Sequence, residues 1–160
     1  MNVEQPAKQI SARGLKVWRI TGAIHSIIML LVVIGGGIVF YFFEWPMWIV
    51  YIAAGLFVVL AILSIFIIPT IRWRRWRYEV REQEIELQHG ILIITRTLVP
   101  MVRVQHVDTT QGPLLRKYDL ATIQISTAAT QHEIPAVDLQ EAEEMRHAIS
   151  RLARVAEDDV

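Results

Sequence analysis

The sequence lacks cysteine altogether, and it lacks the short motifs of common catalytic sites. The absence of cysteine excludes disulfides, thiolate metal sites and cysteine nucleophiles. No Gly-x-Ser-x-Gly, phosphate-loop or dinucleotide-binding pattern occurs. No two of the five histidines have the four-residue spacing of zinc-binding pairs on a helix: His25, His89, His106, His132 and His147. We therefore expect no catalytic residues, no metal site and no cofactor.

A net charge is absent from the whole chain but present in each half. Residues 1–77 carry eight basic and two acidic side chains, and residues 78–160 carry eight basic and fourteen acidic ones. The halves therefore have net charges of +6 and −6 and cancel. Nucleic-acid backbones are bound by lysine and arginine, so we expect the acidic second half to have no nucleic-acid partner.

Two long runs, residues 20–43 and 46–68, have no Asp, Glu, Lys or Arg. About 20 apolar residues cross the ~30 Å hydrocarbon layer of a bilayer. Only Glu44 and Trp45 separate the runs, which predicts an antiparallel helical hairpin over residues 20–68. Trp45 and Trp48 are predicted to lie at the lipid headgroups. The first run is too long for a signal peptide and has no small-residue cleavage site, so we expect it to be retained.

Basic residues flank one end of both predicted spans: Arg13, Lys16, Arg19, Arg72, Arg74, Arg75 and Arg77. The opposite end has Glu44 and no basic residue. The positive-inside rule then predicts a multi-pass protein of the bacterial plasma membrane with both termini in the cytoplasm. Residues 1–19 are predicted to form a cytoplasmic tail, mobile over residues 1–11.

Arginine and tryptophan interleave after the second span, in Arg72, Trp73, Arg74, Arg75, Trp76 and Arg77. This pattern is typical of a positively charged anchor combined with an aromatic belt, so we predict that these residues lie at the membrane interface. Each arginine near an anionic leaflet contributes about 1 kcal/mol of attraction, and the same run could therefore bind acidic headgroups.

Beyond residue 69 the pattern changes to short β-type segments. Strands are predicted at residues 78–80, 85–87, 91–97, 99–107, 120–126 and 132–135. A helix follows, for which Asp138 and Glu141 have capping-box spacing. Its apolar stripe is suited to packing on a sheet: Ala142, Met145, Ile149 and Leu152. The sequence thus predicts a small α+β domain over residues 72–156 and an acidic tail over residues 157–160.

Several strings in this domain carry a resemblance: Arg103-Val-Gln105-His-Val107, Gln111-Gly112-Pro113-Leu114-Leu115-Arg116, Leu120-Ala121-Thr122-Ile123 and Ser126-Thr127-Ala128. With the two preceding spans, residues 77–152 resemble the bacterial PH-domain membrane proteins, the bPH2 or DUF304 group. The resemblance implies a PH-like fold of two antiparallel sheets and seven strands, closed at one end by the C-terminal helix. It also implies a protein that is not an enzyme.

The chain departs from this family at two positions where glycine is usual. Asp119 can keep its turn, because aspartate tolerates a positive φ. Ala129 leaves the shape of the second turn open.

The first two strings supply a candidate ligand or partner loop: Arg103, Gln105, Gln111, Gly112, Pro113 and Arg116. Its arginines could face a shared carboxylate or phosphate, or pair with Asp108 or Asp119. The Gly-Pro pair could instead simply form a turn.

Two features of the predicted spans are open to functional or structural interpretation. His25 is either functional or interfacial. The run Gly35-Gly36-Gly37 is either a hinge or, with Gly55 on the second span, a site of close helix packing.

We predict a non-catalytic, membrane-anchored PH-like subunit that binds or scaffolds a membrane complex, with cell-envelope stress or export as candidate processes. Its expected partners are membrane lipids and a protein, either a larger bPH2 relative or a second copy of the chain. The alternative is a module that recognises or handles anionic lipids at the inner leaflet. Such a module should lose liposome binding when Arg103 or Arg116 becomes alanine and when salt is raised. A scaffold should instead lose its partner when exposed apolar residues change.

Overall fold

The structure, a computed structural model, describes residues 6–158, with side chains as far as Ala156. The chain divides into two compact units. The first, which we call the hairpin, is Trp18–Thr70, and the second, the domain, combines Met1–Val17 with Ile71–Val160. The predicted fold class is confirmed, because two long apolar helices precede antiparallel sheets and a C-terminal helix.

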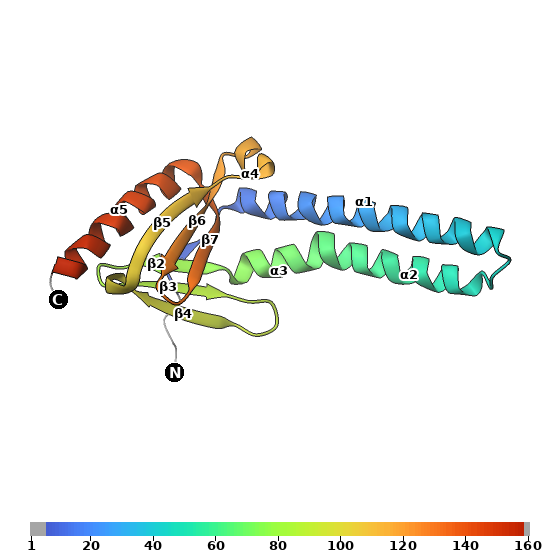
Figure 1. Cartoon of the computed structure of the whole chain (residues 1–160), viewed down its shortest axis with the longest axis horizontal. Coiled ribbons are helices and arrows are strands. Elements are labelled where there is room, and N and C mark those ends of the chain that lie inside the picture. Colours follow the sequence, from blue (N-terminus) through green and yellow to red (C-terminus); the bar gives the residue numbers. More distant parts are fainter. Residues whose placement is uncertain (1–5, 159–160) are drawn as a thin grey trace. The chain divides into compact units, whose positions relative to one another are not determined.

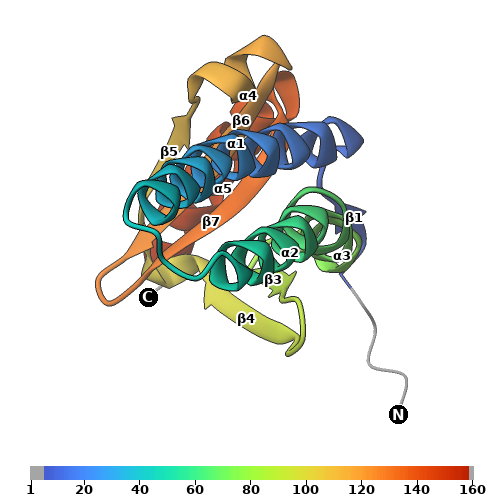
Figure 2. The same ribbon diagram turned by 90° about the vertical axis from the view of Figure 1, so that its right-hand side faces the viewer.

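Two helical stretches build the hairpin. The first is α1 (Ala12–Phe42). The second contains α2 (Trp48–Ile62), a π-helical turn (Leu63–Ile67) and α3 (Ile68–Arg75). Figure 1 and Figure 2 show α1 and α2 side by side. Both stretches are long and apolar enough to cross a membrane, and they extend beyond the predicted spans because the helices continue through the flanking basic residues.

A close approach between the hairpin helices occurs at Gly22. A Cβ at this position would lie 2.5 Å from the Ser64 carbonyl oxygen, in the π-helical turn. At Gly35, Gly36 and Gly55, a Cβ would have no neighbouring atom within 4 Å. The prediction of close packing is therefore wrong for these three glycines. It holds at Gly37, where a Cβ would lie 3.3 Å from the Val50 Cγ1 in α2. The small residue that brings the two backbones together is Gly22.

The domain contains two antiparallel sheets. In the first, the strand order is β1 (Lys8–Gln9), β2 (Arg77–Val80), β3 (Glu84–His89) and β4 (Thr95–Pro100). In the second it is β5 (Val104–Thr110), β6 (Leu120–Thr127) and β7 (Gln131–Asp138), with the short helix α4 (Pro113–Lys117) between β5 and β6. Residues 6–158 thus contain the seven strands that the family resemblance implied.

The strand β1 corrects the prediction of a mobile N-terminal tail. Lys8 pairs with Tyr78, and Gln9 pairs with Arg77. Ile10, the next residue, is buried in the core. Of the predicted tail, only residues 1–5 lie outside the described residues. A strand of two residues has no measurable periodicity, which explains why the sequence pattern did not reveal it.

Two predicted strands have different boundaries in the structure. The predicted strand 91–97 is a loop as far as residue 94, and β4 begins only at Thr95. The predicted strand 99–107 is interrupted by a 3-10 turn, Met101–Arg103, which carries the chain from the first sheet to the second. Apolar alternation continues through this turn because Val99 and Met101 are both buried.

The helix α5 (Leu139–Asp158) lies along β5 and β6 (Figure 1). Three residues of its predicted apolar stripe are buried, Ala142, Met145 and Ile149, and the fourth, Leu152, is half-buried. The helix continues through Asp158 into the predicted acidic tail, of which residues 159–160 lie outside the described part of the chain.

The two turns that lack the family's glycine are stabilised in different ways. Asp119 has a φ of +52°, which confirms that aspartate keeps the left-handed conformation of its turn. In the second turn, the Thr127 Oγ1 accepts hydrogen bonds from the backbone N–H of Ala129 (3.4 Å) and of Thr130 (3.0 Å). A threonine side chain therefore closes the turn, and Ala129 needs no glycine-like φ.

Candidate functional site

The predicted ligand loop at residues 111–116 connects β5 to β6 and contains most of the short helix α4. Gly112 precedes α4, and Pro113 is the first residue of that helix, where the missing N–H of proline costs nothing. The Gln111 side-chain amide donates a 2.8 Å hydrogen bond to the Leu120 carbonyl oxygen. Leu114 and Leu115 of α4 pack on a core cluster: Val17, Leu120 and Ala136. Gly112, Pro113 and Arg116 are exposed, and their part in binding a ligand or partner stays a prediction.

This cluster includes a close contact between the start of α1 and β7. Ala136 has a φ of +52° at the point where the register between β6 and β7 shifts. Its carbonyl oxygen accepts a 3.1 Å hydrogen bond from the Ser11 backbone N–H. A Cβ at Gly14 would lie 2.5 Å from the Ala136 Cβ. Only glycine therefore fits at position 14.

The other half of the predicted loop lies elsewhere. Arg103 and Gln105 are exposed and line a hollow of about 510 Å³ with His132 and the β6–β7 turn. Gln111 and Arg116 follow the opposite end of β5, whose 7 residues extend roughly 20 Å at about 3.3 Å per residue. The structure thus does not bring Arg103 and Arg116 together on one ligand.

The tryptophans of the predicted interface run belong to the domain. Trp76 is only 4% exposed, and its ring stacks on that of His89 with centroids 5.9 Å apart. The Trp73 indole N–H donates a 3.2 Å hydrogen bond to the Ser11 carbonyl oxygen. The prediction for Trp76 is wrong, because a buried side chain cannot contact headgroups.

The remaining residues of that prediction are accessible to different degrees. Arg72 and Arg74 are exposed, whereas Arg75 and Arg77 are half-buried. Trp45 and Trp48 are exposed at the turn of the hairpin, together with neighbouring aromatic side chains. For these residues the interface position stays a prediction.

His25 has a bond within its own helix. Its Nδ1 lies 2.7 Å from the carbonyl oxygen of Thr21, one turn earlier in α1. This contact satisfies one ring nitrogen without a residue from another element.

Two adjoining hollows run along α5, and we call them together the α5 groove. The first, about 410 Å³, lies between α5 and the edge formed by β1 and β2. The second, about 480 Å³, shares Glu82 and Leu152 with the first. The apolar residues that α5 gives to the groove recur at steps of three, four and three: Met145, Ala148, Leu152 and Val155. Met145 and Leu152 also belong to the predicted stripe, and Ala148 and Val155 extend it by the same helical spacing, which the sequence contains.

The rim of the α5 groove is polar, and an ion pair connects it to the N-terminal segment. The Glu141 carboxylate lies 2.7 Å from the Lys8 ammonium and accepts a 3.2 Å hydrogen bond from the Tyr78 hydroxyl. Burial raises the pKa of Tyr78 well above its usual value, and the nearby carboxylate of Glu141 adds to the rise. The Tyr78 hydroxyl thus remains a donor at neutral pH. Glu141 is held by these bonds, and Asp138, with which a capping box was predicted, lies 2.5 Å from Arg13.

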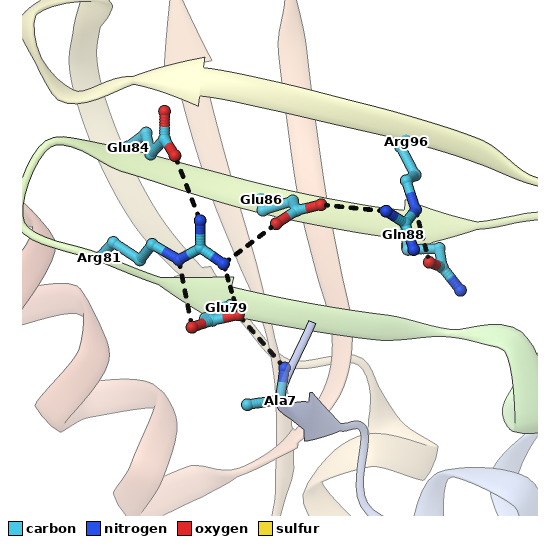
Figure 3. A network of polar contacts seen from close by, with 7 residues as sticks. All are labelled: Ala7, Glu79, Arg81, Glu84, Glu86, Gln88 and Arg96. Carbon is cyan, nitrogen blue, oxygen red and sulfur yellow. Dashed lines mark hydrogen bonds and ion pairs between the residues drawn. The ribbon is translucent and has the colours of Figure 1, made fainter. Parts of the chain in front are cut away.

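An ion-pair network covers one face of the first sheet (Figure 3). Arg81 lies 3.1 Å from a Glu79 carboxylate oxygen and 3.5 Å from one of Glu86. Glu86 lies in turn 3.8 Å from Arg96, whose Nε donates to the Gln88 side chain. The hydrogen bond from Arg81 holds the pKa of Glu79 below its usual value. These charges satisfy one another, which suits a stabilising role better than ligand binding.

Comparison with known proteins gives one family and two relatives. The family model described as "Bacterial PH domain" matches residues 19–153. The UPF0699 transmembrane protein YdbS of Bacillus subtilis (strain 168) is 55% identical over 157 residues, which cover 98% of this chain and 99% of that protein. The UPF0699 transmembrane protein YdbT of the same organism is 26% identical over 98 residues, covering 58% of this chain and 20% of YdbT. No solved structure matches the chain.

Proposed function

Because the chain belongs to the bacterial PH domain family of membrane proteins, we propose that it is a non-catalytic, membrane-anchored subunit that holds a second protein in a membrane complex. Cell-envelope stress or export are the processes in which we place such a complex. The observation that carries the proposal is the α5 groove.

The α5 groove has the composition of a site for a segment of another protein. Its apolar residues continue onto the exposed part of α5, where Val155 is about half exposed beside Val102 of the 3-10 turn. Charged residues of both signs surround this apolar line, including Lys8, Arg81 and Glu144. A partner helix or strand with an apolar stripe and flanking charges would bury the stripe and pair with the rim.

We propose a larger protein of the same family as the partner, with a second copy of this chain as the alternative. The matched region covers only 20% of YdbT, so a related segment occurs within a much longer chain. Two proteins that carry related domains can present complementary versions of the same groove and helix.

We also propose that both termini and the domain lie in the cytoplasm. The strands β1 and β2 flank the hairpin in the sequence and pair with each other in one sheet. This pairing supports a hairpin whose two ends are on the same side of the membrane. The basic residues at those ends favour the cytoplasmic side.

The test is purification of the full-length protein from native membranes in nanodiscs, followed by native mass spectrometry. We expect a stoichiometric second polypeptide, lost in the groove variants Leu152→Asp and Val155→Asp because a buried carboxylate at the contact is costly. The matched controls, Arg151→Asp and Arg154→Asp, change exposed residues of the same helix and should keep the partner. A partner that both groove variants retain would contradict the proposal.

The alternative function, recognition of anionic lipid, is favoured by the hollow that Arg103, Gln105 and His132 line. In the same experiment, a retained anionic lipid without a second polypeptide would support it. That lipid should be lost in Arg103→Ala and at high salt, because screening weakens exposed ionic contacts. Arg116→Ala, at the other end of β5, should have no effect on lipid bound in this hollow.

A further inference from the structure

We propose that the loop between β3 and β4 inserts into the lipid bilayer. We call the loop the apolar tip, and it consists of Ile91, Leu92, Ile93 and Ile94. It connects the paired strands β3 and β4 of the domain (Figure 1). The inference is independent of the α5 groove, because the groove and the tip have no residue in common.

The apolar tip exposes more aliphatic surface than a water-soluble loop does. Leu92 is 92% exposed, Ile93 81%, Ile94 51% and Ile91 37%. Runs of three or four exposed apolar residues are rare on soluble domains unless they have a function, and contiguous apolar patches mark contact with a protein or a membrane. The tip has no polar side chain of its own.

The backbone of the apolar tip is shaped by Gly90. This glycine has a φ of +139°, a conformation that residues with a Cβ avoid. A Cβ at Gly90 would lie 1.9 Å from the Ile93 carbonyl oxygen, so the chain folds back on itself tightly. The fold holds the tip as a compact projection, with Leu92 and Ile93 left uncovered by the rest of the domain.

The position of the apolar tip favours a bilayer as the covering partner. The Arg75 guanidinium donates a hydrogen bond to the Ile91 carbonyl oxygen. Arg75 is the last residue of α3 and of the second candidate span, and it follows Ile68, at the apolar start of that helix, by seven positions. The tip is therefore attached to the point where the second candidate span ends.

The charges beside the apolar tip fit an anionic leaflet. Arg72 and Arg74 are exposed on the last turns of α3, next to the arginine that holds the tip. Aliphatic side chains that enter the acyl region, with cations at the headgroups, form the usual combination of interfacial membrane contacts. A bilayer covers aliphatic side chains without directional contacts, and the side chains of the tip offer none.

The experiment uses the absence of cysteine, which allows single-cysteine labelling of the full chain. A fluorophore is attached at Leu92→Cys or Ile93→Cys, and the protein is reconstituted in nanodiscs that contain phosphatidylglycerol and nitroxide-labelled lipid. We expect strong quenching by the lipid nitroxide and little quenching by aqueous iodide. The label at Arg151→Cys, at an exposed position of α5, should show the reverse, and Tyr51→Cys in α2 gives the reference for a span.

Two results would overturn the proposal. A tip label quenched by iodide as strongly as the Arg151→Cys label would show that the tip is in water. A label shielded from both quenchers would show that a protein surface covers it. A second variant guards against an effect of the label itself: a label at Ile94→Cys should lose its lipid quenching when Leu92→Asp and Ile93→Asp are added, and both of these replace exposed residues outside the core.

Discussion

The hairpin and the domain treat apolar side chains in opposite ways. In the most apolar part of each candidate span, none of the residues is buried within the chain. In the domain, Ile123, Ile125 and Ile134 have no exposed surface at all. The hairpin therefore depends on lipid to cover its side chains, whereas the domain covers its own. The apolar tip belongs to the domain, but it leaves its aliphatic side chains exposed as the helices of the hairpin do.

The two units also differ in how much local detail they require. The hairpin needs length, apolar composition and close approaches at Gly22 and Gly37. The domain needs a left-handed residue at Ala136, a glycine at position 14 and a threonine-closed turn. We expect substitutions to have larger effects on the stability of the domain than on the hairpin, and three experiments test this contrast.

The largest effect is expected from removing core volume. Ile123→Ala should destabilise the domain by about 2–5 kcal/mol, because it leaves a cavity among buried side chains. Ile34→Ala, at an exposed position of α1, should change the stability of the domain by less than about 0.5 kcal/mol. The stability of the domain in both variants can be measured by hydrogen exchange of the β6 amides, with the protein in nanodiscs. If the two variants lost equal amounts of domain stability, the contrast between the two units would be contradicted.

A smaller effect is expected from adding one methyl group at a glycine. Gly14→Ala should cost about 1–3 kcal/mol of domain stability, since its Cβ would clash with the Ala136 Cβ. Gly35→Ala has no such neighbour and should be neutral or stabilise α1 by up to about 1 kcal/mol. Adding Ala136→Gly should rescue Gly14→Ala, because it removes the clashing Cβ and suits the φ of +52°. A double variant as unstable as Gly14→Ala would refute the contact.

The smallest effect is expected from pH. Hydrogen bonds from Arg81 and Arg146 hold the pKa of Glu79 and of Glu143 below their usual values. A carboxyl with a lower pKa in the folded state stabilises the protein above its unfolded pKa of about 4.3, and this contribution is lost as pH falls through the folded pKa. The melting temperature of the domain should therefore fall in acid. Glu79→Gln should flatten the profile, whereas Glu44→Gln at the hairpin turn should leave it unchanged.

The sequence predicted the features that depend on long or regular patterns. The spans followed from uncharged runs, and β2, β3 and β6 followed from alternation of apolar residues. The stripe of α5 followed from helical periodicity, and three of its four residues are buried. The turn at Asp119 followed from a property of one residue type, and its positive φ agrees.

The features that sequence reasoning missed depend on contacts between distant residues. The strand β1 is defined by its pairing with β2 and has no periodicity of its own. The apolar tip has the composition of a strand, and only the fold-back at Gly90 makes it a loop. Likewise, Arg103 and Arg116 are close in sequence, but the extended β5 separates them. Composition and local spacing do not show which distant residues come into contact, and these three features depend on such contacts.

The pairing of β1 with β2 also sets the order of events during synthesis. Gln9 emerges from the ribosome 68 positions before Arg77, its partner in the sheet. At about 5–20 residues per second, β1 waits roughly 3–14 seconds for β2, and the whole hairpin is made in the interval. The first sheet can close only when both ends of the hairpin are on one side of the membrane. In a chain with one misplaced span, β1 and β2 would lie on opposite sides of the membrane, and the edge of β2 that pairs with β1 would stay unpaired.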